Sequence, residues 1–104
     1  MVGYDSRSQL GQIVLITHGR DAGQYAIIVR LLDERFVFLA DGDKKKFNQP
    51  KKKNILHLKL IDYVSPEVQR SLLETGRVTN GKLRFALSKF ESLKKKGVEF
   101  DGER

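Results

Sequence analysis

The sequence predicts a mainly β fold, a small antiparallel barrel or curled sheet followed by a C-terminal pair of helices. In the first half of the chain, three short runs rich in branched apolar and aromatic residues succeed one another, at residues 11–17, 24–32 and 35–41. Beyond Asp62 the apolar residues change to a helical spacing. The length of 104 residues fits one domain, so both parts are expected to belong to a single folding unit.

Each of the three runs has the boundaries of a buried strand. Residues 11–17 read GQIVLIT and are followed by the turn-like HGRDAG, and residues 24–32 read QYAIIVRLL. Asp33 and Glu34 then form a tight polar link to the third run, RFVFLAD, which is too short for a helix. Because the links are short, we expect the three strands to be antiparallel neighbours.

A basic loop, residues 43–54, is expected to separate the third strand from the next. The sequence DGDKKKFNQPKKKN has turn signals at its Asp-Gly pair and before Pro50, and Phe47 is almost its only apolar side chain. A further strand is expected at residues 55–61, ILHLKLI. Its alternation places Leu56 and the two following leucines on one face, and His57 and Lys59 on the other.

Two helices are expected beyond residue 64. Ser65 can cap the first helix with Pro66 at its first position, and Gly76 ends it. Thr79 or Asn80 can cap the second, which ends in lysines that suit the negative end of its dipole. The inward stripes are Val68, Leu72 and Leu73 in the first helix, and Leu83, Ala86, Leu87, Phe90 and Leu93 in the second.

The expected domain organisation follows from these elements. Residues 1–63 form the barrel, and residues 64–97 form a helical extension. A barrel of this size is marginal in isolation, so we expect the extension to pack on it. The tail, residues 98–104, is expected to fray.

The positive charge is concentrated in one segment. The chain has 20 Lys and Arg against 13 Asp and Glu, a net charge of +7. Seven lysines and no acid lie between Asp43 and Asp62, and outside this segment bases and acids are equal in number. Like charges this close repel one another unless a polyanion or counterions neutralise them. The segment predicts contact with nucleic acid or an acidic surface, and the alternative is a solvated loop without a partner.

Several classes of function lack the residues that they need. There is no cysteine, which excludes disulfides, thiol nucleophiles and zinc sites built on sulfur. The two histidines and the scattered carboxylates match no metal-site or nucleophile–base spacing, and there is no GxxxxGK[ST] phosphate loop. We therefore expect no enzyme activity, no metal and no cofactor. Without a signal peptide or an apolar run of about 18 residues, a cytoplasmic monomer that does not enter membranes is expected.

The stretch GQIVLITHGRDAGQYAIIV resembles a KOW motif, with a strand that begins at a glycine, a basic GRDxG loop and a second strand of branched apolar residues. With RFVFLADG and KKKNILHLKL, it is similar to the KOW proteins of the archaeal and eukaryotic large ribosomal subunit and their small bacterial relatives. The resemblance covers residues 11–61 and implies an SH3-like barrel that binds structured RNA. Gly23 matches the characteristic glycine of that family, whereas Ala22 and Gln24 stand where relatives often carry Lys or Arg.

Two segments supply the candidate RNA-binding residues. Gly19 and Gly23 permit the close backbone approach of a turn against a phosphate, or they only close a hairpin. The lysines can displace counterions from RNA phosphates but read little base sequence. Phe47 can stack on a base, as can Tyr25, and the alternative is that Phe47 plugs its own loop. His57 can contact the RNA backbone, and the alternative is a histidine that is merely exposed. The candidates are Arg20, Gly23, Lys44, Lys45, Lys46, Phe47, Lys51, Lys52, Lys53, His57 and Lys59.

The combined prediction is an RNA-binding protein that docks on ribosomal or other structured RNA through the lysine-rich loop and the KOW-like loop, in translation or ribosome assembly. A second class is a protein-interaction adaptor of the transcription or translation machinery, because the helical pair can serve as a partner-binding surface. The two differ in their response to salt, since RNA binding weakens steeply with ionic strength and an apolar interface barely responds.

Overall fold

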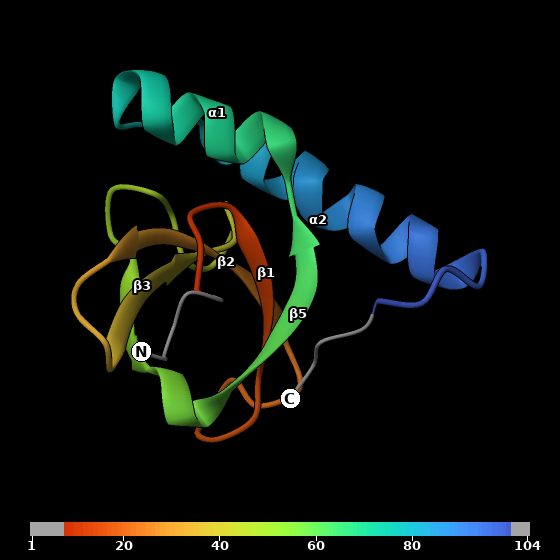
Figure 1. Cartoon of the computed structure of the whole chain (residues 1–104), viewed down its shortest axis with the longest axis horizontal. Helices are drawn as coiled ribbons and strands as arrows, with labels where there is room; N and C mark the ends of the chain where they lie inside the picture. The colour runs from red at the N-terminus through yellow and green to blue at the C-terminus, as the bar shows by residue number, and fades with distance from the viewer. Residues whose placement is uncertain (1–7, 101–104) are drawn as a thin grey trace.

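A computed structural model describes residues 8–100 and, within them, five strands followed by two α-helices (Figure 1). The strands are β1 (Gln12–Ile16), β2 (Tyr25–Leu31), β3 (Phe36–Ala40), β4 (Lys51–Asn54) and β5 (Leu58–Val64). A short 3-10 helix, η2 (Ile55–His57), joins β4 to β5, and α1 (Pro66–Thr75) and α2 (Asn80–Lys95) follow β5. The predicted order of strands and then helices is confirmed.

The strands form one antiparallel sheet in the order β4-β3-β2-β1-β5. The three strands predicted from the branched apolar runs are neighbours, as expected from their short links. The tightest of these links is held by Asp33, whose carboxylate accepts the N–H groups of Arg35 at 2.8 Å and Phe36 at 2.9 Å. These two backbone hydrogen bonds hold the pKa of Asp33 below its ordinary value.

The sheet curls but does not close into the expected barrel. Strands β4 and β5 are its two edges, and they do not pair with each other within residues 8–100. The link between them accounts for this. Asn54 Oδ1 accepts the N–H of Leu56 at 2.8 Å and caps η2, which turns the chain away from a hairpin.

Two boundaries in the lysine-rich region differ from the prediction. Residues 51–54 pair with β3 as an edge strand, so the basic loop ends at Pro50. The strand expected at residues 55–61 begins three residues later, because residues 55–57 form η2. As a result Leu56 is 81% exposed instead of facing the interior with the other leucines. Lysines suit an edge strand because they discourage pairing with another chain.

Each face of the curled sheet carries an apolar cluster, because successive strand residues point to opposite faces. The cluster inside the curl consists of Val14, Ile16, Ala26, Ile28, Val37, Leu39 and Leu58. The cluster on the outer face contains Ile13, Ile27, Val29, Ala40 and Ile61 together with Val68, Leu72, Val78, Leu83, Ala86 and Phe90. Figure 1 shows the two helices lying outside the curl. The helices thus complete the outer cluster.

The ends of the helices follow the predicted signals. Ser65 Oγ accepts the N–H of Val68 at 3.3 Å, Pro66 begins α1, and Gly76 ends it in the left-handed conformation with φ of +76°. For α2 the cap is Thr79, whose hydroxyl accepts the N–H of Lys82 at 3.1 Å. Leu73 departs from the predicted inward stripe and is 68% exposed.

Ser65→Ala is expected to lower the free energy of unfolding by about 1 kcal/mol, because the Val68 N–H loses its acceptor in a buried position. The corresponding fall in Tm is roughly 4–8 °C. Ser92→Ala, on the exposed face of α2, is the control and should leave Tm almost unchanged. Equal Tm values for the two variants would contradict the capping role.

The ring of Phe100, in the C-terminal segment, lies against aromatic side chains of β5 and α2. The ring centre of Phe100 lies 5.1 Å from that of Tyr63 and 5.1 Å from that of Phe90. Phe100 thus packs on the outer cluster, and the expected fraying of residues 98–104 stays a prediction. Residues 101–104, like residues 1–7 of the expected barrel, lie outside the described residues.

No helix in the described range, residues 8–100, has the length and apolar character needed to cross a membrane.

Candidate nucleic-acid interface

The β1–β2 loop, residues 17–24, lies at the centre of the candidate interface. Its turn is closed by the N–H of Ala22, which donates to the Gly19 carbonyl at 3.2 Å, and by the N–H of Gly23, which donates to the Ile16 carbonyl at 2.8 Å. Both glycines have a φ of +94°, which other residues rarely adopt. A Cβ at Gly19 would lie 3.2 Å from Lys53 Nζ, whereas a Cβ at Gly23 would meet nothing within 4 Å. Gly19 thus admits a lysine from β4, and Gly23 serves the turn itself.

Lys45 ties the β3–β4 arm, residues 41–50, to this loop. Its ammonium lies 3.1 Å from the carboxylate of Asp21 and 4.0 Å from that of Asp41, and its side chain is only 7% exposed. Asp41 also accepts the N–H groups of Asp43 at 2.8 Å and Lys45 at 2.9 Å, which shapes the start of the arm. A buried ammonium needs such partners. Lys45 therefore differs from the other predicted RNA-binding lysines, because its charge holds two loops together.

The pKa of Asp21 shows that lysines of both the arm and β4 lie near the β1–β2 loop. The hydrogen bond from Lys45 and the charge of Lys45 hold the pKa of Asp21 below its ordinary value of 3.8, and the charges of Lys51 and Lys53 lower it further. Two lysines of β4 are therefore close enough to act on the β1–β2 loop. The arm, the loop and the edge strand meet at one place on the molecule.

Asp21→Asn is expected to lower Tm at pH 7, because Lys45 loses its nearest carboxylate. A lowered folded-state pKa contributes stability above the unfolded value of 3.8, and this contribution is lost as the pH falls through the folded value. The difference in Tm between the wild-type protein and Asp21→Asn should therefore shrink in that acidic range. Asp43→Asn, an exposed position on the same arm, is the control and should show little difference at any pH. A difference for Asp21→Asn that stays constant would contradict this role.

Strand β4 presents its lysines to two faces. Lys51 lies opposite Leu39 and Lys53 opposite Val37, so both share the face inside the curl. Lys53 Nζ also donates to the carbonyl of His18 in the β1–β2 loop at 3.5 Å. Lys52 points to the outer face, where its ammonium lies 4.9 Å from the ring centre of Phe36. Lys51 and Lys53 therefore join the loop, and Lys52 does not.

The histidine predicted on the last strand lies beside the β1–β2 loop. The ring centre of His57 is 4.8 Å from that of His18, and its carbonyl accepts the N–H of Thr17 at 2.9 Å. Both histidines are exposed. In β5, Lys59 lies opposite Leu15 of β1 and is therefore on the outer face, whereas Leu58 faces the interior. His57 itself lies in η2, before the strand that carries Lys59.

The remaining cationic candidates are open to solvent. Arg20 at the tip of the β1–β2 loop, and Lys44 and Lys46 on the arm, are exposed. No ion pair within residues 8–100 engages them, nor Lys51 or Lys53. We call Arg20, Lys44, Lys46, Lys51 and Lys53, with His18 and His57 beside them, the cationic surface. Such a group of unpaired charges suits a phosphate backbone.

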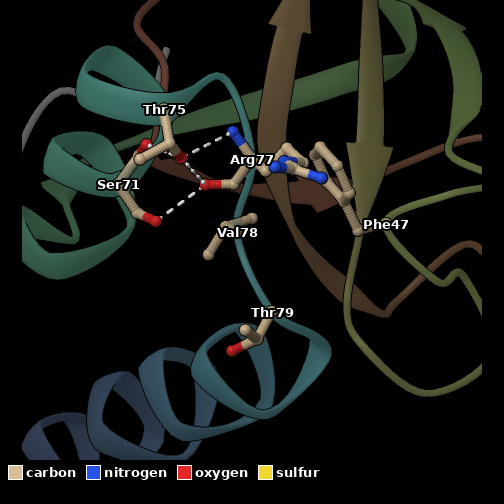
Figure 2. Close-up of a pocket in the computed structure, with 6 residues that line it drawn as sticks. All are labelled: Phe47, Ser71, Thr75, Arg77, Val78 and Thr79. Carbon is tan, nitrogen blue, oxygen red and sulfur yellow. Dashed lines mark hydrogen bonds between the residues drawn. The ribbon is translucent and has the colours of Figure 1, made fainter.

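Phe47 lies two residues after Lys45 in the arm and is half-buried. Its ring packs against the outer cluster, and its N–H donates to Asn80 Oδ1 at the start of α2, at 2.8 Å. The ring thus acts in part as the predicted plug of its own loop. It also lines a pocket of about 310 Å³ with the connection between α1 and α2 (Figure 2).

Two cationic residues near the interface, Lys94 and Arg77, were not among the candidates predicted from the sequence. Lys94, assigned only to the helix dipole, lies 4.6 Å from the ring centre of Tyr25, directly after the β1–β2 loop, and donates to the Tyr25 hydroxyl. Arg77 lines the pocket beside Phe47. For Lys94, the only signal in the sequence was a run of lysines at a helix end. Its place beside Tyr25 depends on the packing of Phe90 on Tyr25, with ring centres 5.1 Å apart.

The described part of the chain, residues 8–100, brings no three histidine or carboxylate side chains together as metal ligands.

Comparison with known proteins adds a relative. The chain matches no protein-family model. It is 49% identical over 71 residues to a protein of Bacillus subtilis (strain 168) named "Putative ribosome-binding protein YbzG". The aligned part covers 68% of this chain and 96% of that relative. An identity this high over nearly the whole relative shows that the chain belongs to the same family as the Bacillus subtilis protein.

Proposed function

We propose that this protein binds the ribosome by docking its cationic surface on ribosomal RNA, in translation or ribosome assembly, and thus acts in the cytoplasm. The observation that carries the proposal is the joining of the β1–β2 loop to the lysine-rich arm through the Asp21–Lys45 ion pair. It gathers charges from segments distant in the chain onto one surface. The name of the Bacillus subtilis relative and the resemblance of residues 11–29 to a KOW motif support the choice of partner.

The chemistry of the surface favours binding led by charge and shape. Four exposed or half-exposed lysines and Arg20 can each displace counterions from a phosphate, and this release drives association. Lysine offers no planar fork for a base edge, so these residues position the RNA without reading its sequence. Structured RNA, in which phosphates lie close together along grooves and junctions, matches a compact group of charges.

The pairing of Lys45 with Asp21 serves this function indirectly. Like charges on Lys44, Lys46, Lys51 and Lys53 repel one another, and the arm that carries two of them is nearly devoid of apolar residues. The ion pair of Lys45 with Asp21 and the Phe47–Asn80 hydrogen bond tie the middle of the arm to the β1–β2 loop and to the start of α2. A surface held in place before binding loses less conformational entropy when RNA docks.

Co-sedimentation of the purified protein with Bacillus subtilis ribosomes, and with their separated subunits, tests the proposal. We expect binding at low salt that weakens by about a thousandfold between roughly 50 and 200 mM salt if about six phosphates are contacted. Binding that is insensitive to salt would instead favour a protein partner. Absence of binding at low salt would overturn the proposal.

A further inference from the structure

A pocket opens where the β3–β4 arm meets the connection between α1 and α2 (Figure 2). Its volume is about 310 Å³, at the lower end of the range of small-molecule sites. The lining side chains are Phe47 from the arm, Ser71 and Thr75 from α1, and Arg77, Val78 and Thr79 from the connection. The pocket thus combines an aromatic ring, three hydroxyl groups and a guanidinium group.

Two hydroxyl groups of α1 line the pocket, and both donate to backbone carbonyls. Ser71 Oγ donates to the Arg77 carbonyl at 2.7 Å, and Thr75 Oγ1 donates to the Ser71 carbonyl at 2.9 Å. Figure 2 shows these hydroxyls gathered around the backbone of Arg77, whose N–H donates to Thr75 Oγ1 at 3.1 Å. Because the hydroxyl protons are engaged by carbonyls, lone pairs on Ser71 Oγ remain for an N–H group of a ligand.

The guanidinium of Arg77 supplies the complementary donors. Within residues 8–100 it has no hydrogen-bond or ion-pair partner, and the residue is exposed. Figure 2 shows its side chain extending from the connection toward Phe47. A guanidinium presents a planar set of donors, which suits two adjacent acceptors on one planar ligand.

The ring of Phe47 and the side chain of Val78 give the pocket its apolar part. Val78 is only 5% exposed, and Phe47 is held by its packing on the outer cluster and by the hydrogen bond to Asn80. A fixed ring with one accessible side is the usual platform for an unstacked base.

We propose that this pocket holds a single unstacked guanine base, an inference that deepens the proposed function and rests on it. Guanine offers two neighbouring acceptors, O6 and N7, to a guanidinium, and N–H donors to hydroxyl oxygens. Its flat face matches the Phe47 ring, and Lys46, which directly precedes Phe47 in the chain, is the cation proposed for the adjoining phosphate. The cationic surface then supplies affinity, and the pocket supplies preference for a base.

A nuclear magnetic resonance titration of the full chain with the four nucleoside monophosphates tests the pocket. Guanosine monophosphate should shift the amide signals of Ser71, Thr75 and Arg77 at lower concentration than the other three. Shifts confined to the cationic surface, or equal for all four nucleotides, would show phosphate binding alone and overturn the proposal.

Ribosome binding distinguishes a base in RNA from a free nucleotide. Arg77→Gln should weaken binding about tenfold, whereas Arg70→Gln, an equal change of charge on the exposed face of α1, should have a much smaller effect. Phe47→Leu, which retains an apolar side chain, should also weaken binding about tenfold through lost stacking. Equal effects of Arg77→Gln and Arg70→Gln, even with guanosine monophosphate bound in the pocket, would overturn the assignment to RNA. Failure of the proposed function gives a different result, because the wild-type protein would then not bind ribosomes at all.

Discussion

Replacing Lys44, Lys46, Lys51 and Lys53 together with glutamine should weaken ribosome binding by about 100- to 1,000-fold at low salt and leave the fold intact. Each lysine that contacts a phosphate contributes roughly one counterion to the salt dependence of binding. The slope of log affinity against log salt should therefore fall by about three to four. Sedimentation with ribosomes at several salt concentrations measures both quantities.

The fold should tolerate these four changes because the lysines contribute little to it. None of the four takes part in an ion pair within the described residues, and Lys53 makes only a long hydrogen bond to His18, at 3.5 Å. Removing their mutual repulsion even favours the folded chain slightly. Lys45 is left unchanged, because its replacement would remove the ion-pair partner of the Asp21 and Asp41 carboxylates. A loss of binding could then not be separated from a loss of structure.

The matched control changes the same amount of charge elsewhere. Arg70, Lys89, Lys95 and Lys96 are exposed residues of the helical part, outside the cationic surface. The ion pair of Lys89 with Glu67, at 3.9 Å, is exposed and contributes little stability. Replacing these four with glutamine should reduce ribosome affinity only modestly. Equal losses in both fourfold variants would mean that net charge, and not the cationic surface, drives binding.

The parts of the fold that the sequence predicts are those set by local chemistry. The strands β1 to β3 follow from branched apolar runs with short links, and α1 follows from a serine cap, a proline at its first position and a left-handed Gly76. In each case the side chains needed for the element lie within it or directly beside it. Such signals survive in any tertiary context that keeps the element.

The parts that were not predictable depend on distant residues. The triplet Lys51, Lys52 and Lys53 has no apolar pattern, and it becomes a strand only because β3 offers a backbone edge to pair with. Lys45 reads like its two neighbours in the sequence, yet Asp21, far away in the chain, makes it a buried ion-pair partner. The pocket beside Arg77 exists only because the arm packs on the helical connection. Sequence reasoning therefore named the loop and the arm but could not separate Lys45 from its neighbours or locate the pocket. The role of these segments in RNA binding stays a prediction.

Gly42→Ala should be the most destabilising single change on the arm, with a loss of about 3 kcal/mol or more in the free energy of unfolding. Gly42 has a φ of +82°, and a Cβ there would lie 2.3 Å from the carbonyl oxygen of Asn80. Relief by side-chain movement is not available, because the obstacle is backbone at the start of α2. The glycine carbonyl also accepts Arg84 Nη1 at 2.7 Å, so the two segments are held at this separation. Thermal unfolding should show a fall in Tm of roughly 12 °C or more.

Gly23→Ala separates the two causes of that loss. Gly23 has a comparable φ of +94°, but a Cβ there meets nothing within 4 Å, so only the backbone strain of about 1 kcal/mol is expected. A difference between the variants therefore measures the contact of the arm with α2. Because Asn80 also binds the N–H of Phe47, loosening this contact should disturb the pocket more than the lysines near Asp21. If the two alanine variants unfold at the same temperature, the close approach of Gly42 to Asn80 is not what positions the arm.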